Sequence, residues 1–225
     1  MTNDSKQFHF QSLRLIAPGL YETETTVLPF DKRYLLKSFV LERSQGNVII
    51  YHSPGIEKAQ DDIEALGGAT RVLINHEYES LGGKTDIDLP FWIHEKDAKA
   101  MSETVDIAGQ FTQREMLDDD IEVIPTPGHT PGTTMYLWDN GEHRYLFTGD
   151  FICVDNGEWR TVVLSSSDRE ASIKSLEMIR DLDFDAIVPW VAIKDEPSVF
   201  FVENENDKKE RIQKIIDRVH DGENT

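Results

Sequence analysis

Two histidines and one aspartate stand in sequence contexts that suit a metal site. His129 lies in the segment PTPGHTPG, between two Pro-Gly pairs, and Asp150 ends the segment YLFTGD. His76 directly follows the apolar run VLIN. Prolines and glycines impose an unusual backbone path, and a carboxylate at the end of an apolar strand is costly to bury without a partner. Two imidazoles and one carboxylate can ligate one divalent cation and leave coordination positions open.

Each candidate ligand also has a structural explanation. The loop around His129 can keep its shape without a ligand role, and Asp150 can serve as a buried hydrogen-bond acceptor. Cys153 is the one cysteine of the chain, so an internal disulfide and a cysteine-based zinc cluster are both excluded. We expect Cys153 to be a small buried hydrophobe. A metal site in this chain must therefore use histidine, aspartate or glutamate.

Apolar runs rich in β-branched residues lead into these positions and predict strands. The predicted strands cover residues 34–42, 47–51, 70–75, 90–94, 121–125, 133–138, 144–148, 160–165 and 186–189. Ser44-Gln45-Gly46 predicts a tight connection between the first two strands. Asp139-Asn140-Gly141 predicts a hairpin turn later in the chain.

Helical spacing of apolar residues predicts four helices. They cover residues 56–66, residues 95–102, a segment that starts near residue 168, and a C-terminal segment that contains Ile212, Ile215, Ile216 and Val219. Ser167, with Glu170 three residues later, resembles a capping box that begins the third helix. Two runs of strands, each followed by helices, predict an α+β fold with two sheets face to face and helices outside.

Composition and charge restrict the partners. The chain has 225 residues, 39% of them hydrophobic, and we predict one domain over residues 13–225 after a flexible segment, residues 1–12. The 42 acidic and 23 basic residues give a net charge of −19, which repels nucleic-acid phosphates and anionic lipids. No apolar run is long enough to span a bilayer or to form a signal core. We therefore expect a cytoplasmic protein that acts on a small molecule and contacts neither nucleic acid nor membrane.

The order and spacing of several motifs resemble those of the metallo-β-lactamase-fold hydrolases. The motifs are GLYETE, NVIIYHSPG, VLINHEYESLGG, PTPGHTPGTTMYLW, YLFTGD and AIVPW, and they extend over about residues 13–190. The resemblance implies a four-layer αββα sandwich with the active site at the strand ends. In the family this site holds two metal ions, usually zinc, that activate a bridging water.

The HxHxDH signature of the family is degenerate in this chain. With the strand VLIN aligned, His76 matches the first histidine of the signature and Tyr78 the second. Ser80 then stands in place of the aspartate, and Leu81 in place of the last histidine. Tyr78 could ligate a metal through its phenolate, hydrogen-bond a bound water, or fill vacated space as an aromatic ring.

Two further positions differ from the family. Trp190 replaces the final histidine, and His52 replaces the aspartate of the first motif. The resemblance implies that the surviving set, His76, His129 and Asp150, contacts the first metal, whereas the missing ligands serve the second. We therefore expect one divalent metal (Zn, Fe or Mn), no dinuclear zinc site, and a Trp190 ring in the space of the second metal.

A second alignment is anchored on Gly82-Gly83 and shifts the signature by one residue. It makes Asn75, Glu77, Glu79 and Ser80 the equivalents and supplies oxygen ligands, which resembles the HxExD variant of the flavodiiron branch. We favour the alignment on the strand, because strand ends keep their positions better than loop glycines do. Glu77 and Glu79 remain secondary candidates.

Three functions are consistent with these residues. The first is a mononuclear metal-dependent hydrolase of an ester, thioester or similar bond, with Asp150 as ligand and proton acceptor. The second is an inactive member of the fold that binds a small molecule or another protein without metal. The third is a mononuclear iron protein that handles oxygen, suggested by the set of two histidines and one carboxylate.

Overall fold

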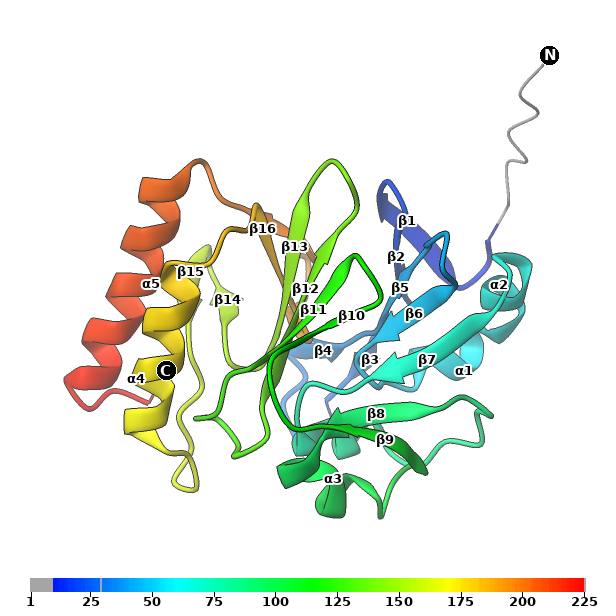
Figure 1. The fold of residues 1–225 in the computed structure, drawn as a ribbon, viewed down its shortest axis with the longest axis horizontal. Helices are drawn as coiled ribbons and strands as arrows, with labels where there is room; N and C mark the ends of the chain where they lie inside the picture. Colours follow the sequence, from blue (N-terminus) through cyan, green and yellow to red (C-terminus); the bar gives the residue numbers. More distant parts are fainter. Residues whose placement is uncertain (1–9, 29, 225) are drawn as a thin grey trace.

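Two β-sheets packed face to face form the centre of the protein (Figure 1). The structure is a computed structural model, and it describes residues 10–28 and 30–224. Within these residues the first sheet has seven strands, in the spatial order β1 (Leu13–Ala17), β2 (Leu20–Thr23), β5 (Phe39–Leu41), β6 (Asn47–Ile50), β7 (Ala69–Leu73), β8 (Phe91–His94) and β9 (Ile107–Phe111). The second has six, in the order β10 (Glu115–Leu117), β11 (Ile121–Pro125), β12 (Thr134–Asp139), β13 (Arg144–Gly149), β16 (Ala186–Pro189) and β18 (Phe200–Phe201).

Smaller elements complete the fold. A three-stranded sheet contains β17 (Val191–Ile193), β4 (Tyr34–Leu36) and β3 (Thr26–Val27), and a two-stranded sheet contains β14 (Cys153–Asp155) and β15 (Glu158–Arg160). The helices are α1 (Gly55–Lys58), α2 (Gln60–Ala65), α3 (Glu95–Met101), α4 (Arg169–Arg180) and α5 (Glu205–His220), and a 3-10 helix, η1, covers Glu77–Gly82. Among the described residues, no helix is long and apolar enough to cross a membrane.

The helices cover the outer faces of both sheets. Helices α4 and α5 lie outside the second sheet, on the left of Figure 1, and α1, α2 and α3 lie outside the first. One apolar cluster fills the space between the sheets, where Phe39, Tyr51 and Phe147 meet edge to face with ring centroids 5.8–6.0 Å apart. Two further clusters join each sheet to its helices. The predicted α+β fold, an αββα sandwich, is confirmed.

The third helix begins with a different cap from the predicted one. The N-cap residue is Asp168, whose side chain accepts a hydrogen bond from Ala171 N at 3.0 Å. Ser167 lies outside the helix, and its hydroxyl donates to the carbonyl oxygen of His129 at 2.9 Å. The capping-box prediction was therefore wrong about the capping residue, and the serine holds the histidine loop instead.

Three predicted elements are shorter or divided. The predicted strand 34–42 forms β4 and β5 in different sheets, and it is interrupted at Lys37 and Ser38, which belong to neither strand. The Lys37 ammonium pairs there with the Glu22 carboxylate at 3.1 Å. The predicted helix 56–66 divides at Ala59 into α1 and α2. In the predicted strand 160–165, β15 ends at Arg160, and beyond it the Val162 carbonyl bonds the His129 ring rather than a neighbouring strand.

The predicted flexible segment 1–12 lies mostly outside the described residues. Of its last residues, Gln11 and Ser12 donate their backbone N–H groups to the carboxylate of Asp62, at 2.9 and 2.6 Å. The same carboxylate accepts from the backbone of Leu13, where β1 begins. These bonds fasten the start of the first sheet to α2.

Parallel pairing brings the site residues to one end of the sheets. Strands β6 and β7 are parallel neighbours in the first sheet, and β13 and β16 are parallel neighbours in the second. Because the carboxyl ends of parallel strands lie at the same edge of a sheet, the loops after β7 and β13 and the residues after β16 can meet there.

Candidate metal centre

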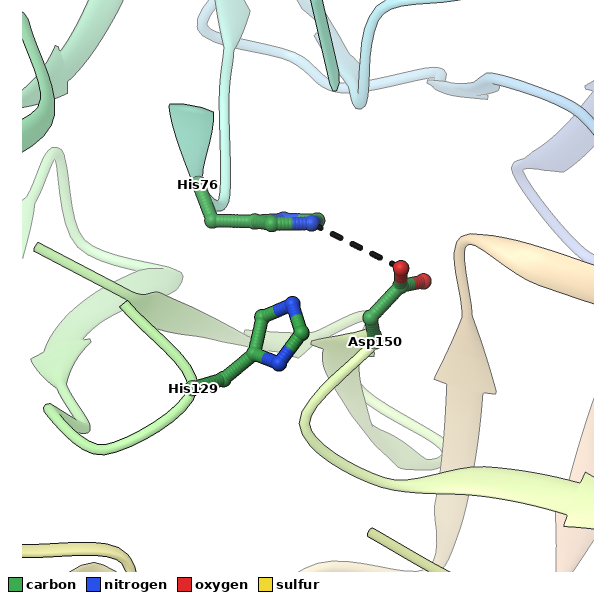
Figure 2. Close-up of side chains that lie close together, drawn as sticks. All are labelled: His76, His129 and Asp150. Carbon is green, nitrogen blue, oxygen red and sulfur yellow. Dashed lines mark ion pairs between the residues drawn. The ribbon is translucent and has the colours of Figure 1, made fainter. Parts of the chain in front are cut away.

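Three side chains from separate loops converge at this end of the sandwich (Figure 2). His76 comes from the loop after β7, His129 from the loop between β11 and β12, and Asp150 follows β13 directly. One ligand atom of each lies within 4.8 Å of the others, and His76 Nε2 is 3.6 Å from Asp150 Oδ2. The three residues span 75 positions of the sequence, and only the packing of the two sheets brings them together.

Gly149 permits the close approach of the two sheets beside this group. Its φ is +59°, and a Cβ at this position would collide with the side chain of Asn75, which precedes His76. The backbone N–H of Gly149 donates to the hydroxyl of Tyr51 at 2.8 Å, and that hydroxyl donates to the carbonyl of Val188 at 2.6 Å. The close contact with Asn75 therefore explains why the TGD motif has a glycine at this position. The backbone position of Gly149 in turn fixes the position of the next residue, Asp150.

The ring of His129 is oriented for metal binding. Its Nδ1 lies 2.9 Å from the carbonyl oxygen of Val162, so Nδ1 carries the proton and Nε2 keeps a free lone pair. Burial, followed by the neighbouring His76, lowers the pKa of His129 to about 4. The ring is therefore neutral at neutral pH, the form that binds metals.

His76 lies between two carboxylates and is fully buried. Its Nε2 faces Asp150, and its Nδ1 is 3.8 Å from Glu79 Oε1. Burial alone would lower the pKa of His76, but the Asp150 carboxylate and then Glu79 outweigh it, so the pKa is raised. A carboxyl group thus faces each ring nitrogen of this imidazole.

The buried carboxylate of Glu79 supports the loop from behind. It accepts hydrogen bonds from the backbone N–H groups of His52 and Asn75, each at 2.6 Å. Burial raises the pKa of Glu79 to about 8. Glu79 was a candidate oxygen ligand in the shifted alignment, but it lies outside the convergent group and joins the ends of β6 and β7 instead.

The unpaired atoms of this group test whether a cation fits. Among the described residues, His76 Nδ1 and Nε2, His129 Nε2 and Asp150 Oδ1 are all buried and have no hydrogen-bond partner. Buried polar atoms without partners are rare and costly. A divalent cation would satisfy one atom of each residue at once, so the donor set fits a mononuclear centre.

Tyr78 packs on the two histidines through its ring. The centroid of the Tyr78 ring lies 5.4 Å from that of His129 and 5.8 Å from that of His76. The Tyr78 ring plane is nearly perpendicular to both imidazole planes. Its hydroxyl is 3.2 Å from Ser166 Oγ, at an exposed position. Of the three roles predicted for Tyr78, the geometry favours the aromatic filler over the phenolate ligand.

Trp190 and His52 form a closed side next to His76. Trp190 is fully buried, its ring lies edge to face on that of His76 at 5.5 Å, and its Nε1 donates to the carbonyl of His52 at 3.1 Å. The ring of His52 points away from the group, with Nε2 2.8 Å from the carbonyl of Gly83. Both side chains are packed and hydrogen-bonded, although His52 Nδ1 is buried without a partner.

The remaining predicted site residues lie around the group rather than in it. Glu77 is half-buried, and burial raises its pKa, but its carboxylate is not part of the convergent set. Ser80 is half-buried in η1, and Leu81 is 43% exposed. Of the two alignments, the one anchored on the strand places a ligand-type side chain, His76, in the group, whereas the shifted one places none there.

Asp97 in α3 is a residue of this region that the sequence did not predict. This buried carboxylate accepts hydrogen bonds from Glu77 N at 3.1 Å, from Gly132 N at 2.7 Å and from the hydroxyl of Thr130. It thereby joins the loop of His76 to the loop of His129. An aspartate in the first turn of a helix is common, so nothing in the sequence marked it as part of the site.

An apolar cavity of about 430 Å³ opens onto the group. His129, Asp150, Tyr78 and Trp190 contribute to its wall. Cys153 also lines it, and burial raises the pKa of its thiol to about 12, so the thiol is inert as a nucleophile at neutral pH.

Comparisons with known proteins agree with this architecture. The chain resembles the DIM-1 metallo-beta-lactamase exposed to ceftazidime, with 14% identity, a TM-score of 0.68 and coverage of 92% of this chain and 99% of the other. A metallo-beta-lactamase from Pontibacter korlensis has 14% identity and a TM-score of 0.69, with coverage of 91% of this chain and 99% of the other. FIM-1 from Pseudomonas aeruginosa, in the mono-zinc form, has 10% identity and a TM-score of 0.66, with coverage of 91% of this chain and 96% of the other.

Similarity in sequence supports the same family. A comparison with curated protein sequences found no match. The sequence profile described as the metallo-beta-lactamase superfamily matches residues 40–189, which is two thirds of the chain and includes all three residues of the convergent group. This chain belongs to the metallo-beta-lactamase superfamily.

Proposed function

We propose that the protein is a hydrolase that uses one divalent metal ion held by His76, His129 and Asp150. The observation that carries this proposal is the set of buried, unpaired ligand atoms in these three side chains. Zinc, iron(II) and manganese(II) all accept two imidazoles and a carboxylate. A structure of the relative FIM-1 is described as its mono-zinc form, so one zinc ion is compatible with the fold.

His129 and Asp150 have different roles at the proposed metal site. When bound, a divalent cation supplies Lewis-acid chemistry, because it polarises a carbonyl and lowers the pKa of bound water. His129 offers a neutral Nε2, and the Val162 carbonyl maintains that tautomer. Asp150 has one oxygen that faces His76 and another, Oδ1, without a partner, so it can hold the cation and accept a proton. We expect an ester, thioester or similar small molecule as substrate.

Metal content tests the proposal directly. Protein purified without chelator, or loaded with zinc, manganese or iron(II), should contain one metal ion per chain by elemental analysis. Anomalous diffraction should place the ion between His76, His129 and Asp150. A metal-free protein after all three loadings would refute the proposal, and two ions per chain would refute the mononuclear part.

A non-catalytic binding protein is the second candidate function. Trp190 and the Tyr78 ring favour it, because they occupy space that ligands have in the family. If side chains filled the groove, no cavity would remain there, but a cavity of about 430 Å³ lies beside His129 and Asp150. A binding protein would therefore hold its ligand in this cavity. If this candidate is correct, His129→Ala should change neither folding nor ligand binding.

An iron protein that handles oxygen is the third candidate, and the same donor set suggests it. Aerobic loading with iron would then produce a visible or paramagnetic signal. Iron-loaded protein without such a signal would eliminate this candidate and leave the hydrolase unaffected.

A further inference from the structure

The cavity beside the candidate metal centre is lined mainly by apolar side chains. Its wall includes Leu28, Phe30, Val162, Leu164 and Ile193, while His129 and Asp150 stand at the side of the histidine group. A volume of about 430 Å³ lies within the range of small-molecule sites. A ligand in the cavity would therefore have a polar end at Asp150 and an apolar body against the hydrophobic wall.

Exposed hydrophobic side chains gather at this cavity. Among the described residues, seven large hydrophobic side chains are exposed, and three of them, Phe30, Leu81 and Leu164, line the cavity. Their exposed fractions are 72%, 43% and 41%. A cluster of exposed apolar side chains around a cavity indicates a binding surface, since isolated ones are scattered on most proteins.

The charges at the cavity disfavour an anionic ligand. Asp150 and Asp155 contribute negative charge to its wall, and the chain as a whole carries −19. Arg160 is the one cation among these lining residues, and one terminal nitrogen of its guanidinium is paired with the Glu158 carboxylate at 2.7 Å. Its Nε is buried without a partner and can donate a hydrogen bond to an uncharged acceptor such as an ester oxygen. An uncharged ligand avoids repulsion from the two aspartates and needs no counter-ion.

We propose that the cavity binds the apolar acyl chain of an uncharged carboxylic ester, with the ester group at the end of the cavity that Asp150 and His129 line. This assignment rests on the proposed hydrolase function. In the reaction, the oxygen of water bonds to the carbonyl carbon, the bond from that carbon to the alkoxy oxygen breaks, and the products are a carboxylic acid and an alcohol. The apolar wall selects long acyl chains over short ones and neutral chains over charged ones.

Binding of neutral methyl ketones tests the cavity without turnover. A series from 2-hexanone to 2-undecanone should bind the metal-free full-length protein with an affinity that rises about fourfold per methylene, measured by calorimetry. Fatty-acid anions of the same lengths should bind more weakly. An affinity independent of chain length would overturn the assignment, as would binding to neutral phosphatidylcholine vesicles without binding of the ketones.

Two exposed leucines supply a matched pair of variants. Leu164→Asp places a charge at the cavity and should lower the affinity for 2-undecanone at least tenfold. Leu15→Asp changes a leucine that is 58% exposed on β1, away from the cavity, and should leave the affinity unchanged. Since both positions are exposed, both variants should fold. An equal effect of the two variants would overturn the assignment.

A turnover series separates this inference from the proposed function. With metal-loaded protein, kcat/KM for p-nitrophenyl esters should rise with acyl length, and a terminal carboxylate on the acyl chain should abolish the gain. If esters are hydrolysed with no preference for acyl length, the proposed hydrolase function is supported and the assignment of the cavity to the acyl chain is wrong. If ketones bind but no metal is bound and no ester is cleaved, the cavity assignment stands as a binding site and the hydrolase fails.

Discussion

The two sides of the candidate metal centre carry opposite kinds of side chain, although both lie at the same end of the sheets. On one side, His76, His129 and Asp150 present buried ligand atoms without partners. On the other, Trp190 is packed on His76 and bonded to the carbonyl of His52. His52 Nδ1 on this second side is also buried without a partner, but no further ligand-type group converges with it among the described residues. A cation can satisfy several orphaned ligand atoms at once only where they converge, as they do on the first side. The two sides differ in whether their ligand-type groups converge, although they share one end of the fold.

Removal of the Trp190 ring tests the closed side and should have the largest effect on stability. Trp190→Ala deletes a fully buried indole, so we expect a loss of about 3–5 kcal/mol in the free energy of unfolding, measured with denaturant. Trp190→Phe is the control, because it keeps most of the packing and loses the hydrogen bond to His52, at a cost of about 1–2 kcal/mol. A loss below about 1 kcal/mol for the alanine variant would show that this side is not closed by packing.

Glu79 joins the two sides, and its removal should affect both. Glu79→Ala leaves the buried N–H groups of His52 and Asn75 without an acceptor, which should cost about 2–4 kcal/mol of unfolding free energy. Glu77→Ala, at a half-buried position of the same 3-10 helix, should cost no more than about 0.5 kcal/mol. Similar losses for the two variants would contradict the bridging role of Glu79.

Removal of one imidazole tests the open side. His129→Ala should weaken binding of zinc at least about 100-fold, because two ligands hold the ion less well than three, and competition with a chelator would measure this. His143→Ala is the matched control, since this half-exposed histidine lies outside the group and should leave zinc affinity unchanged. Unchanged zinc binding by both variants would show that the unpaired atoms do not form a metal site.

A smaller, pH-dependent effect should come from His52 on the closed side. Burial lowers the pKa of His52, and the hydrogen bond to Gly83 and the nearby Glu57 do not reverse this. The unfolded chain therefore takes up a proton near pH 6.5 that the folded protein resists, so this contribution to stability is lost as the pH falls from 7.5 to 5.5. We expect at most about 1 kcal/mol, seen as the difference in unfolding free energy between the wild type and His52→Gln over that range. Identical pH profiles would contradict it.

Local patterns predicted the elements of the fold well, and they failed where distant contacts compete with them. The apolar runs of β7, β11, β12 and β13 are strands as predicted, and the turn at Asp139-Asn140-Gly141 joins two antiparallel strands. The run 34–42 was predicted as one strand but divides at Lys37 and Ser38, where the Lys37 ammonium pairs with a buried carboxylate in β2. Residues 161–165 leave the sheet because a carbonyl of this segment bonds His129.

The sequence by itself determined which ligand types the candidate site offers. The Pro-Gly pairs around His129, the strand that ends in Asp150 and the histidine after VLIN are local features, and they predict ligand types and strand-end positions from the chain alone. The single cysteine likewise excludes a cysteine-based cluster, so a metal site must rely on histidine, aspartate or glutamate.

Only the tertiary structure decided how these residues combine. It packs Trp190 on His76, turns Glu79 inward to hold two strand ends, and uses Asp97 to join two loops. The contacts of Trp190 and Asp97 cross between segments of the two sheets, and those of Glu79 join the ends of two neighbouring strands of the first sheet. No local pattern encodes these arrangements. The residue types set the possible ligands, and the way the sheets pack leaves one side of the site open and closes the other.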